Sequence, residues 1–194
     1  MKIKKVFISL CLVFSMAFMT GCSSDPREVV DQCMKNVQKY DFSTIDSKEL
    51  DETLNSDDAI TNLLLDYFKE CAAKMEYTIK DSKVDGDKAT VSVDATYVDA
   101  SSLLSQAMTY YLSRALQLAF TGASEEELNQ IFVTAFNETK DSYQTKTATC
   151  TIQFECTKDK DGWKITNVSN EFYDVITANA YSYFESFDSS ETKE

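Results

Sequence analysis

The sequence predicts an α+β domain in which helices wrap a curved antiparallel sheet of about four strands. Three observations support this. Apolar residues recur every three or four positions in some segments and every second position in others, which are the periods of helices and strands. Asp85-Gly86 and Asp161-Gly162 separate alternating segments, as tight hairpin turns do. One proline and four glycines among 194 residues favour long regular elements over a loop-rich scaffold.

The chain begins with the features of a secretory signal. Three lysines among the first five residues precede an apolar run from Val6 to Phe18. This run is shorter than the roughly 20 residues that span a bilayer, and polar residues follow soon after it. We therefore expect residues 1–21 to be a signal peptide and not a transmembrane helix.

Met19-Thr20-Gly21-Cys22 closes the apolar run with small residues before a cysteine. This tetrapeptide resembles the lipobox of bacterial lipoproteins, with Met19 where leucine is usual. The resemblance implies cleavage between Gly21 and Cys22, a diacylglyceryl thioether on Cys22, and acylation of the new N-terminus with a chain such as palmitate. It implies a lipoprotein held in the cell membrane by lipid and facing outside the cytoplasm.

Cleavage would leave 173 residues, which is enough for one domain with its own core. We expect residues 22–27 to be a tether, residues 28–188 to be a single α+β domain, and residues 189–194 to be a disordered tail.

The domain begins with two predicted helices. Apolar positions at three- and four-residue spacing predict the first over residues 28–40, and Asp25-Pro26 favours its start. Residues 41–56 are polar and loop-like. A second helix with one apolar face then runs to Met75, capped by Asp57 or the serine before it.

Strict alternation predicts the first two strands, over residues 77–80 and 89–97. The helix predicted next, over residues 101–120, is apolar around well over half of its circumference, so we expect it to be covered on two sides. Ser124-Glu-Glu-Glu127 is a capping box for a fourth helix, which reaches Phe136. These two helices form a hairpin inserted between strands two and three.

Alternation returns over Thr145–Thr157 and predicts a third strand with one buried face. A charged turn leads to a fourth strand over Trp163–Val168. Apolar positions from Phe172 to Phe184 predict a final short helix.

The composition excludes several kinds of catalytic and ligand-binding site. The absence of histidine excludes Ser-His-Asp and Cys-His catalysis and histidine metal sites, and no glycine-rich phosphate loop occurs. We assign no catalytic residue, no cofactor and no metal ion. The net charge of −13 becomes −16 when the three N-terminal lysines leave with the signal. Such a surface repels nucleic acid and anionic headgroups, so attachment to the membrane must rest on the lipid.

Four cysteines remain after Cys22, and all lie on apolar faces: Cys33, Cys71, Cys150 and Cys156. Six residues along one strand place Cys150 roughly 20 Å from Cys156, beyond the roughly 7 Å Cα limit of a disulfide. A disulfide would therefore join Cys33 or Cys71 to each other or to the strand. Buried free thiols are the alternative.

Four aromatic residues are candidates to line a pocket between the sheet and its helices: Tyr97, Tyr111, Trp163 and Phe172. In such a pocket the hydroxyl groups would orient a ligand. At helical and strand spacing, packing in the core is the alternative explanation.

The closing strand Asp161-Gly-Trp-Lys-Ile165, the segment Asn170–Ile176 after it and the order of elements together resemble an uncharacterised lipoprotein family of Gram-positive bacteria. Its members have a nuclear-transport-factor-two-like (cystatin-like) domain. The resemblance covers roughly residues 28–176. It implies a cone-shaped sheet that encloses a hollow, and a binding or scaffolding role.

Three functions are compatible with the sequence. The first is a non-catalytic binding domain that takes a small apolar ligand or an envelope protein on the concave face of the sheet. The second is a structural or assembly lipoprotein that uses the helical hairpin, residues 101–138, as its contact surface. The third is an enzyme of isomerase or dehydratase type. A filled concave face argues against the first, and an exposed apolar patch on the hairpin favours the second.

Overall fold

The computed structural model describes residues 19–20, 25–42, 57–119, 122 and 124–191, and it confirms the α+β class. The elements in chain order are β1 (Met19–Thr20), α2 (Pro26–Lys39), α4 (Ala59–Ala72), β2 (Glu76–Asp85), β3 (Lys88–Asp99), α5 (Ser101–Ala119), α6 (Glu125–Ser142), β4 (Lys146–Asp159), β5 (Gly162–Val168), α7 (Glu171–Ile176) and α8 (Ala180–Glu191). The predictions for residues 1–18, for Gly21 and Cys22, and for most of the loop 41–56 lie outside the described residues.

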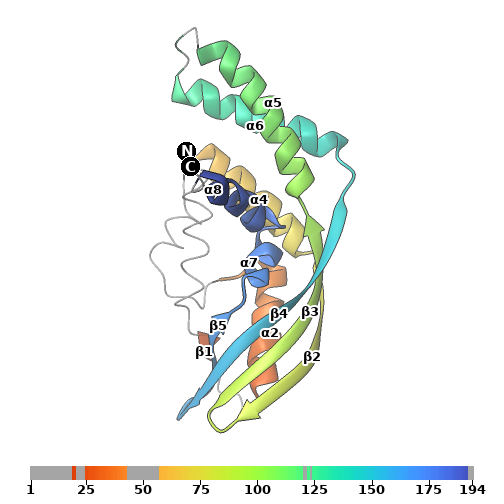
Figure 1. Ribbon diagram of the computed structural model, residues 1–194, viewed down its shortest axis with the longest axis vertical. Helices are drawn as coiled ribbons and strands as arrows, with labels where there is room; N and C mark the ends of the chain where they lie inside the picture. The colour runs from red at the N-terminus through yellow and green to blue at the C-terminus, as the bar shows by residue number, and fades with distance from the viewer. Residues whose placement is uncertain (1–18, 21–24, 43–56, 120–121, 123, 192–194) are drawn as a thin grey trace.

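The sheet is antiparallel, with the strand order β1-β5-β4-β3-β2 (Figure 1). The four long strands are those that the sequence predicts. β1 adds two residues from the predicted signal peptide, and these pair with Lys164 and Ile165 of β5. The hairpin of α5 and α6 is inserted between β3 and β4, as predicted.

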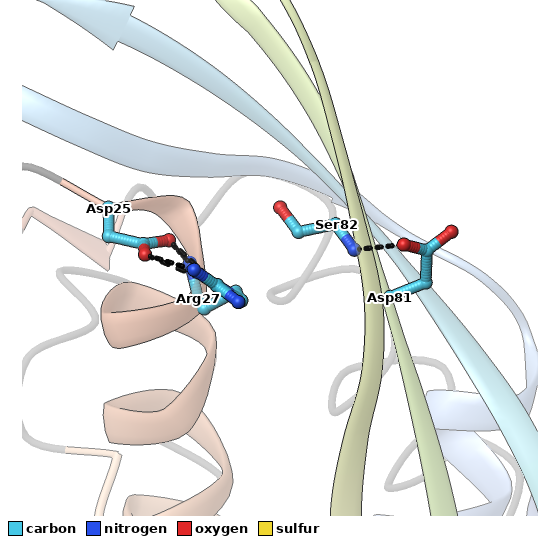
Figure 2. A network of polar contacts seen from close by, with 4 residues as sticks. All are labelled: Asp25, Arg27, Asp81 and Ser82. Atoms are coloured by element: carbon cyan, nitrogen blue, oxygen red, sulfur yellow. Dashed lines mark hydrogen bonds and ion pairs between the residues drawn. The ribbon is translucent and has the colours of Figure 1, made fainter.

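β2 continues to Asp85, beyond its predicted end at Lys80. It is an edge strand with much of both faces exposed, so the alternation that reveals a half-buried strand is weak here. A bulge between Ile79 and Asp81 also changes the phase of the pattern. Just after the bulge, the Asp81 carboxylate accepts a hydrogen bond from the Ser82 N–H at 2.8 Å (Figure 2).

The long strands bow around α2 and α7, which lie on the concave side of the sheet (Figure 1). Side chains from both helices join the inward face of the sheet in one buried core, to which β3 and β4 contribute Ala89, Val91, Val93, Ala95, Tyr97, Ile152, Phe154 and Cys156. The register pairs Val91 with Phe154 and Val93 with Ile152, which places the alternating apolar residues of both strands on one face. The concave face is therefore filled by the protein's own side chains.

Polar contacts fix α2 in place. Its N-cap Asp25 accepts a hydrogen bond from the Arg27 N–H at 2.9 Å and pairs with the Arg27 guanidinium at 2.8 Å (Figure 2). At mid-helix, the Asp31 carboxylate accepts a hydrogen bond from the Tyr77 hydroxyl of β2 at 2.7 Å. The start of the helix is thus capped and its exposed side is tied to the edge strand.

A second buried core joins α4, the base of the α5–α6 hairpin and the start of α8. The α4 N-cap is Asp58, one residue after the predicted Asp57, and its carboxylate accepts from the Thr61 N–H at 2.9 Å. The ring of Phe136 in α6 lies edge-on to Tyr67 of α4, with ring centroids 5.2 Å apart. The hairpin is therefore anchored through its base.

The last predicted helix is two helices, α7 and α8. Between them Ala178 and Asn179 have φ values of 51° and 67°, which turn the chain sharply. The Ala100 N–H donates to the Ala178 carbonyl at 2.8 Å, so this corner is fixed against the junction of β3 and α5. α8 continues to Glu191, into the predicted tail.

Among the described residues, none of the helices combines the length and the apolar character that crossing a membrane requires.

Candidate functional site

The four aromatic residues predicted to line a pocket lie in two separate places. Tyr97, Trp163 and Phe172 are buried in the core on the concave face of the sheet, where Phe172 packs edge-on against Phe154 at 5.6 Å between centroids. Tyr111 packs at the border of the second core, 5.8 Å from the ring of Phe132. Packing accounts for all four side chains, and none of them lines the grooves described below.

One carboxyl with a raised pKa lies near Tyr97. Burial raises the pKa of Asp174, and the carboxylates of Glu171 and Asp99 act in the same direction. The Asp174 carboxylate accepts hydrogen bonds from the backbone N–H and the hydroxyl of Ser182, at 2.9 and 2.7 Å. These bonds tie the carboxylate to the first turn of α8, which is a structural role.

The four cysteines after Cys22 are free in the structure. Burial raises the pKa of Cys33 to about 12, with the nearby Cys156 acting in the same direction, and it raises the pKa of Cys71, Cys150 and Cys156 to about 11. The thiols are therefore protonated at neutral pH and poor nucleophiles. The disulfide that the sequence allows stays a prediction.

Two grooves lie on the sheet, where they run along its outward, polar face. One has a volume of about 510 Å³ and is lined by residues of β2, β3 and β4 that include Thr78, Thr96 and Thr149. Another, of about 520 Å³, lies nearer the β2–β3 turn and includes Thr90 and Thr166. Both are open, mostly polar depressions without a buried charged side chain.

The third groove, of about 450 Å³, lies between the two helices of the hairpin. Tyr110 and Arg114 of α5 and Glu127 and Ile131 of α6 are among the residues that line it. The Arg114 guanidinium lies 5.5 Å from the centre of the Tyr110 ring, within cation–π distance. The groove lies on the hairpin, which projects beyond the end of the sheet (Figure 1).

The hairpin has a rigid base. Leu103, Leu104 and Ala107 of α5 are buried in the second core together with Phe132 and Phe136 of α6. Outside that core, the Lys140 ammonium pairs with the Glu70 carboxylate of α4 at 2.8 Å. The Tyr143 hydroxyl donates to the Asp99 carbonyl at 3.2 Å, and the Lys146 ammonium donates to the Ser102 hydroxyl at 3.2 Å. Such a base can hold the other half of the hairpin, nearest its tip, in a fixed direction.

The distal half of α5 differs from the rest of the surface. Leu112 is 50% exposed and Leu116 is 64% exposed, and among the described residues the other exposed large apolar side chain is Val84 of β2. Arg114 is the one charged residue in the 19 residues of α5, although 26% of the whole chain is charged. The prediction that this helix is covered on two sides is wrong for its distal half, because α6 covers only one side of it there.

We name this surface the α5 outer face and define it by the exposed residues Ser105, Thr109, Leu112, Ser113 and Leu116. Its only signal in the sequence is the excess of apolar positions over those that one contact stripe needs. The sequence does not reveal which of those positions the fold leaves bare.

The fold and this surface define a class of protein, an α+β domain with a projecting helical hairpin that carries an uncharged, partly apolar outer face. No family model matches the chain, and no curated protein matches it. Among solved structures, the chain is similar to the crystal structure of YcdA from Bacillus subtilis, a protein described as a lipoprotein, with 19% sequence identity and a TM-score of 0.37. The similarity covers 83% of this chain and 51% of YcdA, so the chain spans about half the length of that protein. The comparisons do not support the nuclear-transport-factor-two-like domain that the sequence suggests.

Proposed function

We propose that the chain is a lipoprotein anchored outside the cytoplasm through lipid on Cys22, and that it is a non-catalytic protein-binding module whose contact surface is the α5–α6 hairpin. The observation that carries the proposal is the α5 outer face, where Leu112 and Leu116 are exposed on a helix with a single charged residue. The interior of a protein–protein interface is depleted in charge in the same way.

Solvation favours association through this surface. An exposed leucine side chain that becomes fully buried gains about 1.5–3 kcal/mol from the hydrophobic effect. Burying an unpaired charge opposes association, and the α5 outer face has no charge to bury. A partner that covers Leu112 and Leu116 therefore gains apolar contact without a large desolvation cost.

The filled concave face is the reason for preferring the hairpin over a small-ligand site under the sheet. Phe154, Ile152 and Phe172 are completely buried there, packed against α2 and α7. A ligand of drug-like size would have to displace these side chains. Each large cavity opened in such a core costs about 3–5 kcal/mol.

The absence of histidine and the raised pKa values of the thiols support a non-catalytic role. The anchoring part of the proposal is supported by residues 19–22 and by the charge of the chain. An acidic protein is repelled by anionic headgroups, so lipid is the means by which it would stay at the membrane.

Photo-crosslinking in intact cells tests the protein-binding role. The full-length chain would carry a photoreactive amino acid in place of Leu116, with the same replacement at Val84 as the matched control, since Val84 is 57% exposed but lies on β2. We expect a discrete crosslinked protein from position 116 and none from position 84. No adduct at position 116, or equal adducts at both positions, would contradict the proposal.

A further inference from the structure

We propose that the two turns at one end of the sheet, residues 83–88 and 158–164, face an anionic lipid surface, and that this contact directs the α5–α6 hairpin away from the membrane. We name these two segments the turn end. The inference rests on the proposed lipid anchoring through Cys22 and adds the surface that faces the bilayer. Three observations carry it: the position of the turns relative to the anchor, their charge, and the exposed side chain of Val84.

The direction of α2 places the anchor beside the turn end. Near the end of this helix, the Gln38 side chain donates to the Met75 carbonyl just before β2, at 2.8 Å. Closer to its start, Asp31 accepts the hydrogen bond from Tyr77. The start of α2 therefore points toward the β2–β3 turn, and the β4–β5 turn lies beside that turn because β3 and β4 stay paired as far as this end. Figure 1 shows both turns at the end of the molecule opposite the hairpin.

The segment between the lipid and the domain is too short to hold the turn end away from the bilayer. The three residues from Cys22 to Asp25 span at most about 11 Å. From the contact between Gln38 and Met75, β2 rises about 33 Å to its turn, whereas α2 covers about 18 Å to its start. The turns thus extend roughly 15 Å beyond the start of α2. Either they reach the surface in which the lipid is inserted, or the domain lies on its side.

Charge decides between these two orientations. The chain without its signal has a net charge of −16, yet the turn end has five lysines and four aspartates, a net charge of +1: Lys83, Asp85, Asp87, Lys88, Lys158, Asp159, Lys160, Asp161 and Lys164. The start of α2 adds Arg27 and two carboxylates, which makes the whole region neutral. All of the net negative charge lies elsewhere, and an anionic surface repels those other parts. The upright orientation is therefore favoured.

Three of the five lysines are available to lipid headgroups. Lys164 is engaged, because its ammonium pairs with the Asp159 carboxylate at 2.7 Å. Lys83, Lys88 and Lys160 are exposed and form no ion pair within the part of the chain that the structure describes. A lysine close to an anionic membrane contributes about 1 kcal/mol of attraction, which the aspartates of the turns partly offset. The turn end thus orients the protein, and the lipid retains it.

Val84 adds an apolar contact at the same end. It is 57% exposed next to the β2–β3 turn, whereas the other exposed large apolar side chains among the described residues, Leu112 and Leu116, lie on the hairpin. Partial burial at the headgroup level would gain a fraction of the roughly 1.5–3 kcal/mol of full burial. β3 rises about 35–40 Å from this turn to the hairpin. The hairpin would therefore stand well above the bilayer, where a protein partner can reach it.

Fluorescence quenching by spin-labelled lipid tests the orientation. The full-length lipidated chain, purified from membranes of the expressing cell, would carry Val84→Cys or Leu116→Cys in a Cys150→Ser background, in which the other described thiols are buried. Both introduced thiols would receive the same fluorophore. The protein would then be reconstituted into vesicles of phosphatidylglycerol and phosphatidylcholine in which some headgroups carry a nitroxide. Flotation separates vesicle-bound from free protein, with Cys22→Ala as the control for anchoring.

We expect strong quenching at position 84 and none above background at position 116 in the protein that floats with the vesicles. Equal quenching at both positions, or stronger quenching at position 116, would overturn the inference. If the protein floats and neither position is quenched, the inference fails and lipid anchoring stands. If the lipidated chain floats no better than Cys22→Ala, anchoring fails and the inference fails with it.

Matched charge reversals test the role of the lysines. Lys88→Glu combined with Lys160→Glu should lose most of the quenching at position 84. Lys69→Glu combined with Lys74→Glu makes the same change of charge in and just after α4, and it should retain the quenching. High salt should weaken the quenching as the first pair does, because it screens exposed charges. Equal quenching in the two double variants would overturn the assignment to anionic headgroups. Circular dichroism of each variant shows that it is folded.

Discussion

The carboxylate of Asp174 in α7 accepts two hydrogen bonds from Ser182 in α8, one from the backbone N–H at 2.9 Å and one from the hydroxyl at 2.7 Å. This contact bridges the corner where Ala178 and Asn179 adopt positive φ. It therefore joins the part of the chain that fills the concave face to the part that supports the hairpin.

Replacing Asp174 should show how much its buried charge lowers the free energy of unfolding. Burial raises its pKa above the ordinary value of 3.8, so the folded state favours the protonated form, and the free energy of unfolding falls as the pH rises through that raised pKa. Asp174→Asn removes the charge and keeps an oxygen that can accept from the Ser182 N–H. At neutral pH we expect it to match the wild type or exceed its stability by up to about 1 kcal/mol. Asp174→Ala removes the acceptor of both Ser182 hydrogen bonds, so it should lower the free energy of unfolding by about 1 kcal/mol.

Urea unfolding at neutral and mildly acidic pH would check the Asp174 prediction. The difference between Asp174→Asn and the wild type should shrink at the lower pH, where the wild-type carboxyl is protonated. An Asp174→Asn protein as unstable as Asp174→Ala at neutral pH would show that the charge itself is stabilising.

The two halves of the hairpin should respond differently to truncation. Phe136 is fully buried at the base, so Phe136→Ala should lower the free energy of unfolding by about 3–5 kcal/mol. Leu116 is 64% exposed, so Leu116→Ala should change it by less than about 0.5 kcal/mol in the monomer. Denaturant unfolding of dilute protein measures both. A large loss from Leu116→Ala would mean that the distal half is already covered in the monomer.

The thiols should react slowly in the folded protein. Because burial raises the pKa of Cys33 to about 12 and that of Cys71 to about 11, both thiols stay almost wholly protonated at moderately alkaline pH, and labelling should remain slow there. Unfolding without a reductant should expose all four thiols after Cys22 to a thiol reagent. Labelling that increases only after reduction would establish a disulfide, and mass spectrometry of nonreduced peptides would identify its two cysteines.

The anchoring proposal predicts a change of location for Cys22→Ala. Without the thiol no lipid can be attached, so the variant should be released from membranes or remain uncleaved with its signal peptide. Cell fractionation and intact-mass measurement distinguish these two results, and Cys150→Ser is the matched control. A Cys22→Ala protein that is processed and membrane-bound like the wild type would contradict lipid anchoring.

The sequence is most informative where one face of an element is buried. β3 and β4 alternate strictly because their inward residues fill the core, and both were predicted in nearly their observed extents. β2 was predicted too short because an edge strand has few buried positions. The break between α7 and α8 has no glycine to mark it, since Ala178 and Asn179 adopt the left-handed conformation there.

The candidate site was only partly accessible from the sequence. The hairpin and its place between two strands follow from periodicity and from the capping box at Ser124 and Glu127, which the structure confirms. Periodicity cannot tell which apolar positions a tertiary fold will cover. Leu104 and Leu112 are equally apolar, yet one is buried under α4 and α6 and the other is half exposed.

The pairing of β1 with β5 has a consequence for maturation. Met19 and Thr20 precede the proposed cleavage site, so their removal would withdraw the outermost strand and turn β5 into an edge. The backbone N–H groups of β5 that face β1 would then exchange hydrogen with water more rapidly. Precursor and mature protein would differ in the sheet border that they offer to other chains, and that border would first become available when the leader departs.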